Sequence, residues 1–227
     1  PMAALPPLPT ARRRGGALLP VAVALGAASC AWLLIRSSSP PLGALVAEAE
    51  TGAEFPEELA GQPLVATGAR RKFGAVRVYA VGLYLDKRSG LWGKSPSRKE
   101  LLEKAVGRAR LRLVITSSLV TQEKLTSALR ESLGPRLSGL AAEEAERVLD
   151  EFGGLLAKGP RLKKGLVIVF TVWRNAVQVE VGKGYKGRVS SAHLARALLS
   201  TYFDDQAVIP AFRDAAIASL GRGIEEA

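Results

Sequence analysis

The chain has almost none of the residues that most metal sites and thiol nucleophiles require. Its 227 residues include one cysteine, Cys30, and one histidine, His193. A single cysteine cannot form a disulfide within the chain, and the two residues together argue against a Cys/His zinc site or a Cys–His nucleophile. A Ser–His–acid triad is not excluded by counting, but no Gly-x-Ser-x-Gly motif supports one. The sequence therefore predicts no metal and no cofactor.

Acidic residues are missing from the first 46 positions, which contain four arginines. The whole chain carries 32 Lys and Arg against 21 Asp and Glu, a formal net charge of +11, so the remainder keeps +7, spread along its segments. A nucleic-acid stripe would interleave its cations with aromatic side chains. Arg108, Arg110 and Arg112 alternate with Ala and Leu instead, which favours the exposed face of a half-buried strand. We therefore expect no nucleic-acid partner.

One long apolar run, residues 17–35, separates a basic, Pro-rich arm (residues 1–16) from a Ser/Pro/Gly linker (residues 36–52). A helix of 19 uncharged residues nearly covers the hydrocarbon core of a bilayer, which is about 30 Å thick. Two interpretations stay open: a transmembrane anchor, and the apolar region of a cleaved signal or transit sequence. The anchor predicts a membrane-attached protein in an organelle, plastid or mitochondrion, with a bacterial envelope as the alternative.

The remaining chain, residues 53–227, is predicted to form one α+β domain. Strand patterns cover residues 64–67, 75–85, 110–116, 166–173 and 176–181, and helical patterns cover 100–106, 122–133, 141–157, 192–203 and 211–220. The two-residue connection Arg174-Asn175 is typical of a β-hairpin. These features favour an antiparallel β-sheet covered by a layer of helices. The basic, Gly-containing stretch 183–188 is predicted to be an ordinary connection.

Three cations follow each other in residues 68–74, at the end of one predicted strand and just before the next. Such a cluster is typical of a solvated turn. However, Arg70 precedes the strand residue Tyr79 by nine positions, and a guanidinium beside a phenol could bind one carboxylate. Strand alternation over 76–85 places Val78 on the face opposite Tyr79. The fully apolar strand 166–173 is either core alone or core that also lines a cavity.

Four stretches in order resemble the chalcone isomerase-like superfamily. The most specific is the Gly-x-Arg-x-Lys…Val-Tyr-Ala-x-Gly-Leu-Tyr run within residues 68–84, and the others lie in 111–137, 165–170 and 190–205. The likeness extends over residues 53–227. It implies an antiparallel sheet with helices against it and a ligand cleft between them. The superfamily contains true isomerases, which close chalcones to flavanones, and non-catalytic relatives that bind fatty acids.

The resemblance implies four ligand-binding residues: Arg70, Tyr79, Thr201 and Tyr202. The position of Tyr79 is typically Thr in true isomerases and Tyr in the fatty-acid binders. True isomerases also place a catalytic Tyr just after the third strand, and the corresponding stretch 117–126 contains none. The resemblance thus implies a non-catalytic protein that binds a fatty acid or another small apolar carboxylate. A chalcone–flavanone isomerase (an intramolecular lyase) and a membrane-tethered scaffold with a vestigial cleft remain alternatives.

Overall fold

The structure, a computed structural model, describes residues 44–72 and 76–223. The predicted basic arm (1–16), the predicted apolar helix (17–35) and the first part of the predicted linker lie outside the described residues. The membrane anchor therefore stays a prediction. Within the described ranges, no helix combines the length and apolarity that crossing a bilayer requires.

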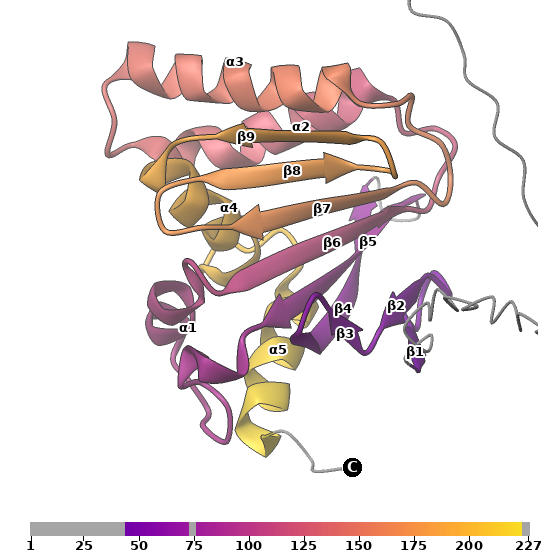
Figure 1. Cartoon of the computed structure of the whole chain (residues 1–227), viewed down its shortest axis with the longest axis vertical. Coiled ribbons are helices and arrows are strands. Elements are labelled where there is room, and N and C mark those ends of the chain that lie inside the picture. Colours follow the sequence, from indigo (N-terminus) through magenta and orange to yellow (C-terminus); the bar gives the residue numbers. More distant parts are fainter. Residues whose placement is uncertain (1–43, 73–75, 224–227) are drawn as a thin grey trace, which may run out of the picture. The chain divides into compact units, whose positions relative to one another are not determined.

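A seven-stranded antiparallel sheet forms the centre of the domain (Figure 1). Its strands, in spatial order, are β3 (Glu58–Leu59), β4 (Gln62–Lys72), β5 (Val76–Leu85), β6 (Ala109–Ile115), β7 (Val167–Val172), β8 (Val177–Val181) and β9 (Tyr185–Val189). Each strand pairs with the one that follows it in sequence, so all the connections link adjacent strands. A separate hairpin pairs β1 (Leu45–Ala47) with β2 (Glu54–Pro56).

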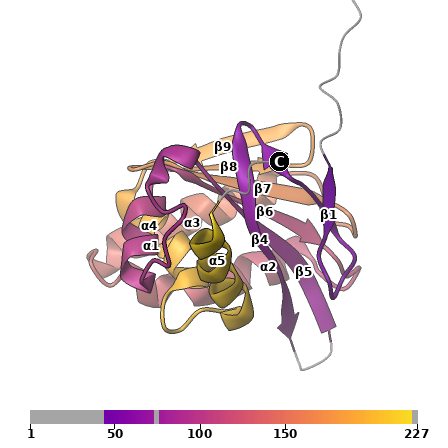
Figure 2. The same ribbon diagram turned by 90° about the horizontal axis from the view of Figure 1, so that it is seen from below.

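The α-helices and the β1–β2 hairpin lie on opposite sides of the sheet (Figure 2). The helices are α1 (Arg98–Ala105), α2 (Gln122–Leu133), α3 (Ala142–Lys158), α4 (Ala192–Phe203) and α5 (Pro210–Arg222). Ser97, Thr121 and Ser191 start three of them, since each side chain accepts a hydrogen bond from a backbone N–H of the first turn. Pro210 opens α5, where its missing N–H costs nothing.

The main hydrophobic core fills the space between the sheet and the helices. Alternate residues of strands β4 to β9 point into it, for example Leu111 and Leu113 of β6, while a smaller cluster around Phe55 covers the opposite face. All buried members of both clusters lie within residues 55–220. Residues 39–227 also cluster as one compact unit. This part of the chain therefore contains the whole core that it needs to fold on its own.

The predicted antiparallel α+β architecture is confirmed, with differences at several strands. The stretch 183–188 was predicted to be a connection, and this is wrong, because residues 185–189 form the edge strand β9. Gly187 brings β9 against α3, since a Cβ there would lie 2.6 Å from Leu155 Cδ2. Lys and Gly are poor strand formers, so the local pattern does not reveal this edge strand. Strand β1 lies inside the predicted linker 36–52.

Candidate functional site

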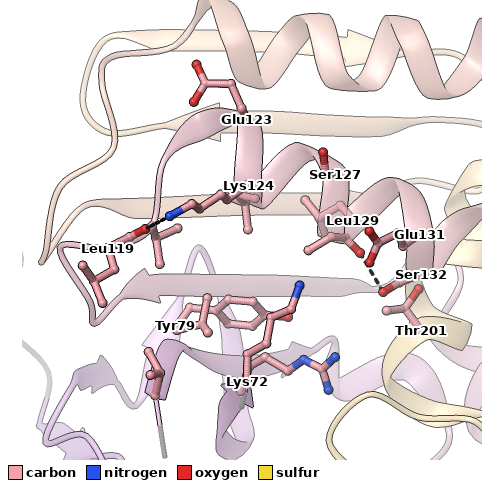
Figure 3. A pocket seen from close by; sticks show the side chains of 16 residues that line it. Lys72, Tyr79, Leu119, Glu123, Lys124, Ser127, Leu129, Glu131, Ser132 and Thr201 are labelled. Atoms are coloured by element: carbon pink, nitrogen blue, oxygen red, sulfur yellow. Dashed lines mark hydrogen bonds between the residues drawn. The ribbon is translucent and has the colours of Figure 1, made fainter.

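A cavity of about 520 Å³ lies between α2 and the β4–β5 pair (Figure 3). Its wall on one side is α2 from Glu123 to Ser132, and on the other side Val76 and Val78 contribute aliphatic surface. Leu119 and Val120, from the loop before α2, extend that apolar lining. The volume is typical of sites that bind small organic molecules, which range from roughly 300 to 1,000 Å³.

Arg70 and Tyr79 are directly opposite each other across β4 and β5. The next pair along is Arg71 with Arg77, so Val78 is an extra residue in β5 and forms a β-bulge. A bulge changes the direction of the side chains next to it. Val78 and Tyr79 consequently both line the cavity. The prediction that strand alternation places them on opposite faces is therefore wrong at this point.

The guanidinium of Arg70 is held by the loop between α4 and α5. Its Nη1 donates a hydrogen bond to the backbone carbonyl of Val208. A guanidinium has five N–H donors, and this bond uses one of them. Arg70 is partly buried and lines the cavity. Its remaining donors are therefore in position to bind an anionic group, with the orientation of the side chain set by the Val208 carbonyl.

A pair of buried phenols lies beside this guanidinium. The hydroxyls of Tyr79 and Tyr202 are 3.1 Å apart, and one donates to the other. Burial raises the pKa of the Tyr79 phenol, and the bond to Tyr202 and the charge of Arg70 oppose part of that rise. Burial likewise raises the pKa of Tyr202, and its proximity to Tyr79 adds to the effect. Two neutral phenols joined by one hydrogen bond leave one O–H that can be donated to a ligand.

Three of the four predicted site residues, Arg70, Tyr79 and Thr201, line the same cavity. The hydroxyl of Thr201 donates to the Ala197 carbonyl at 3.0 Å, so only its oxygen lone pairs are available to a ligand. Tyr202 is fully buried and is not part of the lining, and it reaches the cavity only through its bond to Tyr79. The structure thus brings the four residues together, with Tyr202 in a supporting position.

The sequence analysis missed Lys72 and the polar side of α2. The expectation of a solvated turn over residues 68–74 is wrong for residues 68–72, because β4 continues to Lys72. Lys72 follows Arg70 by two positions in this strand, and both line the cavity. Glu123 and Lys124 line the cavity from α2. The stretch 117–126 supplies Leu119 and Val120 but no phenol. Among the described residues, no group of three His, Cys, Asp or Glu side chains could hold a metal ion.

Comparisons with known proteins agree with this fold. A crystal structure of a fatty-acid binding protein from Arabidopsis thaliana superimposes with a TM-score of 0.66 at 23% identity, over 78% of this chain and 99% of that one. This likeness shows a shared fold. No curated protein matches the sequence. The sequence model of the family described as chalcone isomerase-like matches residues 51–216. Since this match extends over well more than half of the chain, the protein belongs to the chalcone isomerase-like family, as the sequence motifs indicated.

Proposed function

We propose that this protein binds a fatty acid, or a similar small apolar carboxylate, in the cavity between α2 and the β4–β5 pair, and does so without catalysing a reaction. One observation carries the proposal. Arg70 and Tyr79 are cross-strand neighbours, and they present a guanidinium and a phenol to a cavity with aliphatic walls. The fatty-acid binding protein that shares the fold supports this choice of ligand.

The polar and apolar parts of the cavity match the two ends of such a ligand. Thr201 and Leu119 lie at opposite ends of the site (Figure 3). Arg70 and Tyr79 would bind the carboxylate, and a charge-assisted hydrogen bond contributes about 1.5–3 kcal/mol. The acyl chain would extend toward Leu119 and Val120, at about 0.8 kcal/mol per buried methylene. Without Arg70, the carboxylate would be buried as an unpaired charge, and this cost would cancel most of the free energy gained by burying the acyl chain.

The absence of a reaction is supported by the composition of the cavity. The only tyrosine among its lining residues in the described part of the chain is Tyr79, and its hydroxyl is paired with Tyr202. The segment 117–126, where true isomerases of the superfamily carry a catalytic Tyr, provides aliphatic and charged side chains instead.

The proposal is tested by replacing two consecutive arginines. Arg70→Ala removes the guanidinium from the cavity, whereas Arg71→Ala removes an exposed one that pairs with Glu50 at 2.7 Å. We expect Arg70→Ala to weaken the binding of laurate or palmitate by roughly 10- to 100-fold, and Arg71→Ala to leave it nearly unchanged. Displacement of a fluorescent fatty acid measures both. Parental affinity in Arg70→Ala would refute the role given to this residue.

A second measurement addresses catalysis and the natural ligand. Naringenin chalcone mixed with the protein should close at the spontaneous rate, as followed by absorbance. Clear turnover above that rate would contradict a non-catalytic function. Native mass spectrometry of the purified domain should detect a co-purified lipid carboxylate, whereas a domain that neither retains nor takes up fatty acid would favour a scaffold with a vestigial cleft.

A further inference from the structure

The cavity opens near one end of the sheet, and exposed cations gather at that end. The last residues of β4, β6 and β8 and the first residues of β5, β7 and β9 lie there, toward the right in Figure 1. We call these cations the basic rim. It consists of six exposed residues, Lys72, Lys124, Arg161, Lys163, Lys164 and Lys183.

Backbone and side-chain hydrogen bonds hold the segments of the basic rim next to one another. The Gly165 N–H donates to the Ile115 carbonyl at 2.8 Å, which places the turn before β7 against the end of β6. The Gly182 N–H donates to the Val167 carbonyl at 2.8 Å, so the β8–β9 turn also lies beside the start of β7. Gln122 at the start of α2 donates to the carbonyl of Gly159 after α3. These bonds therefore keep the turn before β7, the β8–β9 turn and the segments around α2 and α3 close together at this end.

The basic rim keeps a net positive charge, although Glu123 of α2 interacts electrostatically with Arg161. Glu50, in the turn of the nearby β1–β2 hairpin, already pairs with Arg71 and lies 4.0 Å from Arg77. Glu180 pairs with Lys186. Within residues 44–72 and 76–223, no ion pair neutralises the lysines at positions 163, 164 and 183. This end of the molecule consequently attracts anionic surfaces.

An exposed leucine projects where the basic rim meets the cavity. Leu119 is 65% exposed, although it also lines the cavity and its neighbour Val120 is buried. Lys124 donates from Nζ to the Leu119 carbonyl at 3.2 Å, which ties this loop to α2. An exposed apolar side chain next to lysines fits the interface of an anionic bilayer, where the leucine enters the acyl boundary and the ammonium groups contact the headgroups.

We propose that the basic rim and Leu119 dock the mouth of the cavity on an anionic lipid bilayer. This inference rests on the proposed function, which identifies the ligand as a fatty acid, and it adds the place where the fatty acid enters and leaves the protein. With the carboxylate at Arg70 and the tail toward Leu119, the tail leaves first. At a docked mouth it enters hydrocarbon directly, so its methylenes are not exposed to water.

The test uses ligand-free residues 39–227, the self-contained unit, which lacks the predicted anchor. Co-sedimentation compares phosphatidylcholine vesicles with vesicles that also contain phosphatidylglycerol. We expect binding to the anionic vesicles that weakens with salt. Lys163→Ala/Lys164→Ala should weaken it on the order of thirty-fold, because each lysine near an anionic surface contributes about a factor of five. Lys87→Ala/Arg88→Ala, at the opposite end of β5, is the matched control and should bind normally.

Equal binding to both kinds of vesicle, or equal losses in the two double variants, would overturn the docking proposal. Leu119→Ser should reduce vesicle binding and slow the transfer of a fluorescent fatty acid to vesicles. The results distinguish a failure of the proposed function from a failure of the docking proposal. A domain that docks as described but takes up no fatty acid refutes the proposed function, whereas one that binds fatty acid normally and ignores anionic vesicles refutes the docking.

Discussion

The two hydrogen-bonded phenols, Tyr79 and Tyr202, should contribute unequally to the free energy of unfolding. Tyr202 is fully buried, whereas Tyr79 borders the cavity, and their hydroxyls are 3.1 Å apart. Tyr79→Phe leaves the Tyr202 hydroxyl buried without a partner and should lower the free energy of unfolding by about 1–3 kcal/mol. Tyr202→Phe leaves the Tyr79 hydroxyl beside a cavity that water or ligand can enter. Its cost should therefore be smaller, about 1 kcal/mol or less.

The double variant Tyr79→Phe/Tyr202→Phe tests whether the two hydroxyls stabilise the fold as a pair. Adding Tyr202→Phe to Tyr79→Phe removes the orphaned hydroxyl, and replacing both partners of a hydrogen bond by apolar groups can be nearly neutral. The double variant should therefore be more stable than Tyr79→Phe alone, with a coupling free energy of about 1–3 kcal/mol. Urea unfolding of ligand-free residues 39–227 measures all four proteins, and the melting temperature should change by roughly 2–4 °C per kcal/mol.

The two phenols should also differ in their effect on fatty-acid affinity. Only Tyr79 contacts the cavity, so Tyr79→Phe should weaken binding by about tenfold, the equivalent of one hydrogen bond. Tyr202→Phe should have a much smaller effect. The reasoning fails if Tyr202→Phe is the more destabilising single change, or if the two stability losses simply add. The first result would mean that the Tyr79 hydroxyl, and not that of Tyr202, is the one left without a partner. Additive losses would mean that the two hydroxyls do not depend on each other for their hydrogen bond.

Three further outcomes follow from the described contacts, and urea unfolding measures each. Burial raises the pKa of both phenols above the usual value of about 10, so on raising the pH the unfolded state loses these protons before the folded state does. The free energy of unfolding should therefore hold below about pH 10 and fall above it, and it should fall less steeply in the double Phe variant. Gly68→Ala should lower the free energy of unfolding by about 1–3 kcal/mol, because its Cβ would lie 2.7 Å from Phe212 Cβ. Gly154→Ala, in α3, has open space around its Cβ and should raise the free energy of unfolding by up to about 1 kcal/mol. The opposite order of stability would contradict the packing. Arg136→Ala should cost about 1–3 kcal/mol, since its guanidinium makes two bonds to Asp204 at 2.7 and 2.9 Å; an unchanged midpoint would show that this ion pair contributes nothing.

The helices were predictable because their signals are local. Ser97 and Thr121 immediately precede α1 and α2, and each side chain accepts a backbone hydrogen bond from the first turn of its helix. The periodicity of residues 192–203 likewise reproduces α4. Strand β9 was missed because an edge strand with Gly and Lys has no such local pattern. It is defined by its pairing with β8 and by α3 packing on Gly187.

By itself, the sequence determined the α+β class, the strand that carries Tyr79, and the family motifs that suggested a carboxylate ligand. Only the tertiary structure decided the β-bulge at Val78, the carbonyl that orients Arg70, and the closure of the cavity by α2. The physical reason is sequence separation. Helix caps and strand periods act over a few residues, whereas Tyr79 and Tyr202 are 123 positions apart and Arg70 and Val208 are 138 apart. Contacts of that range depend on the packing of the whole domain, which no local pattern encodes.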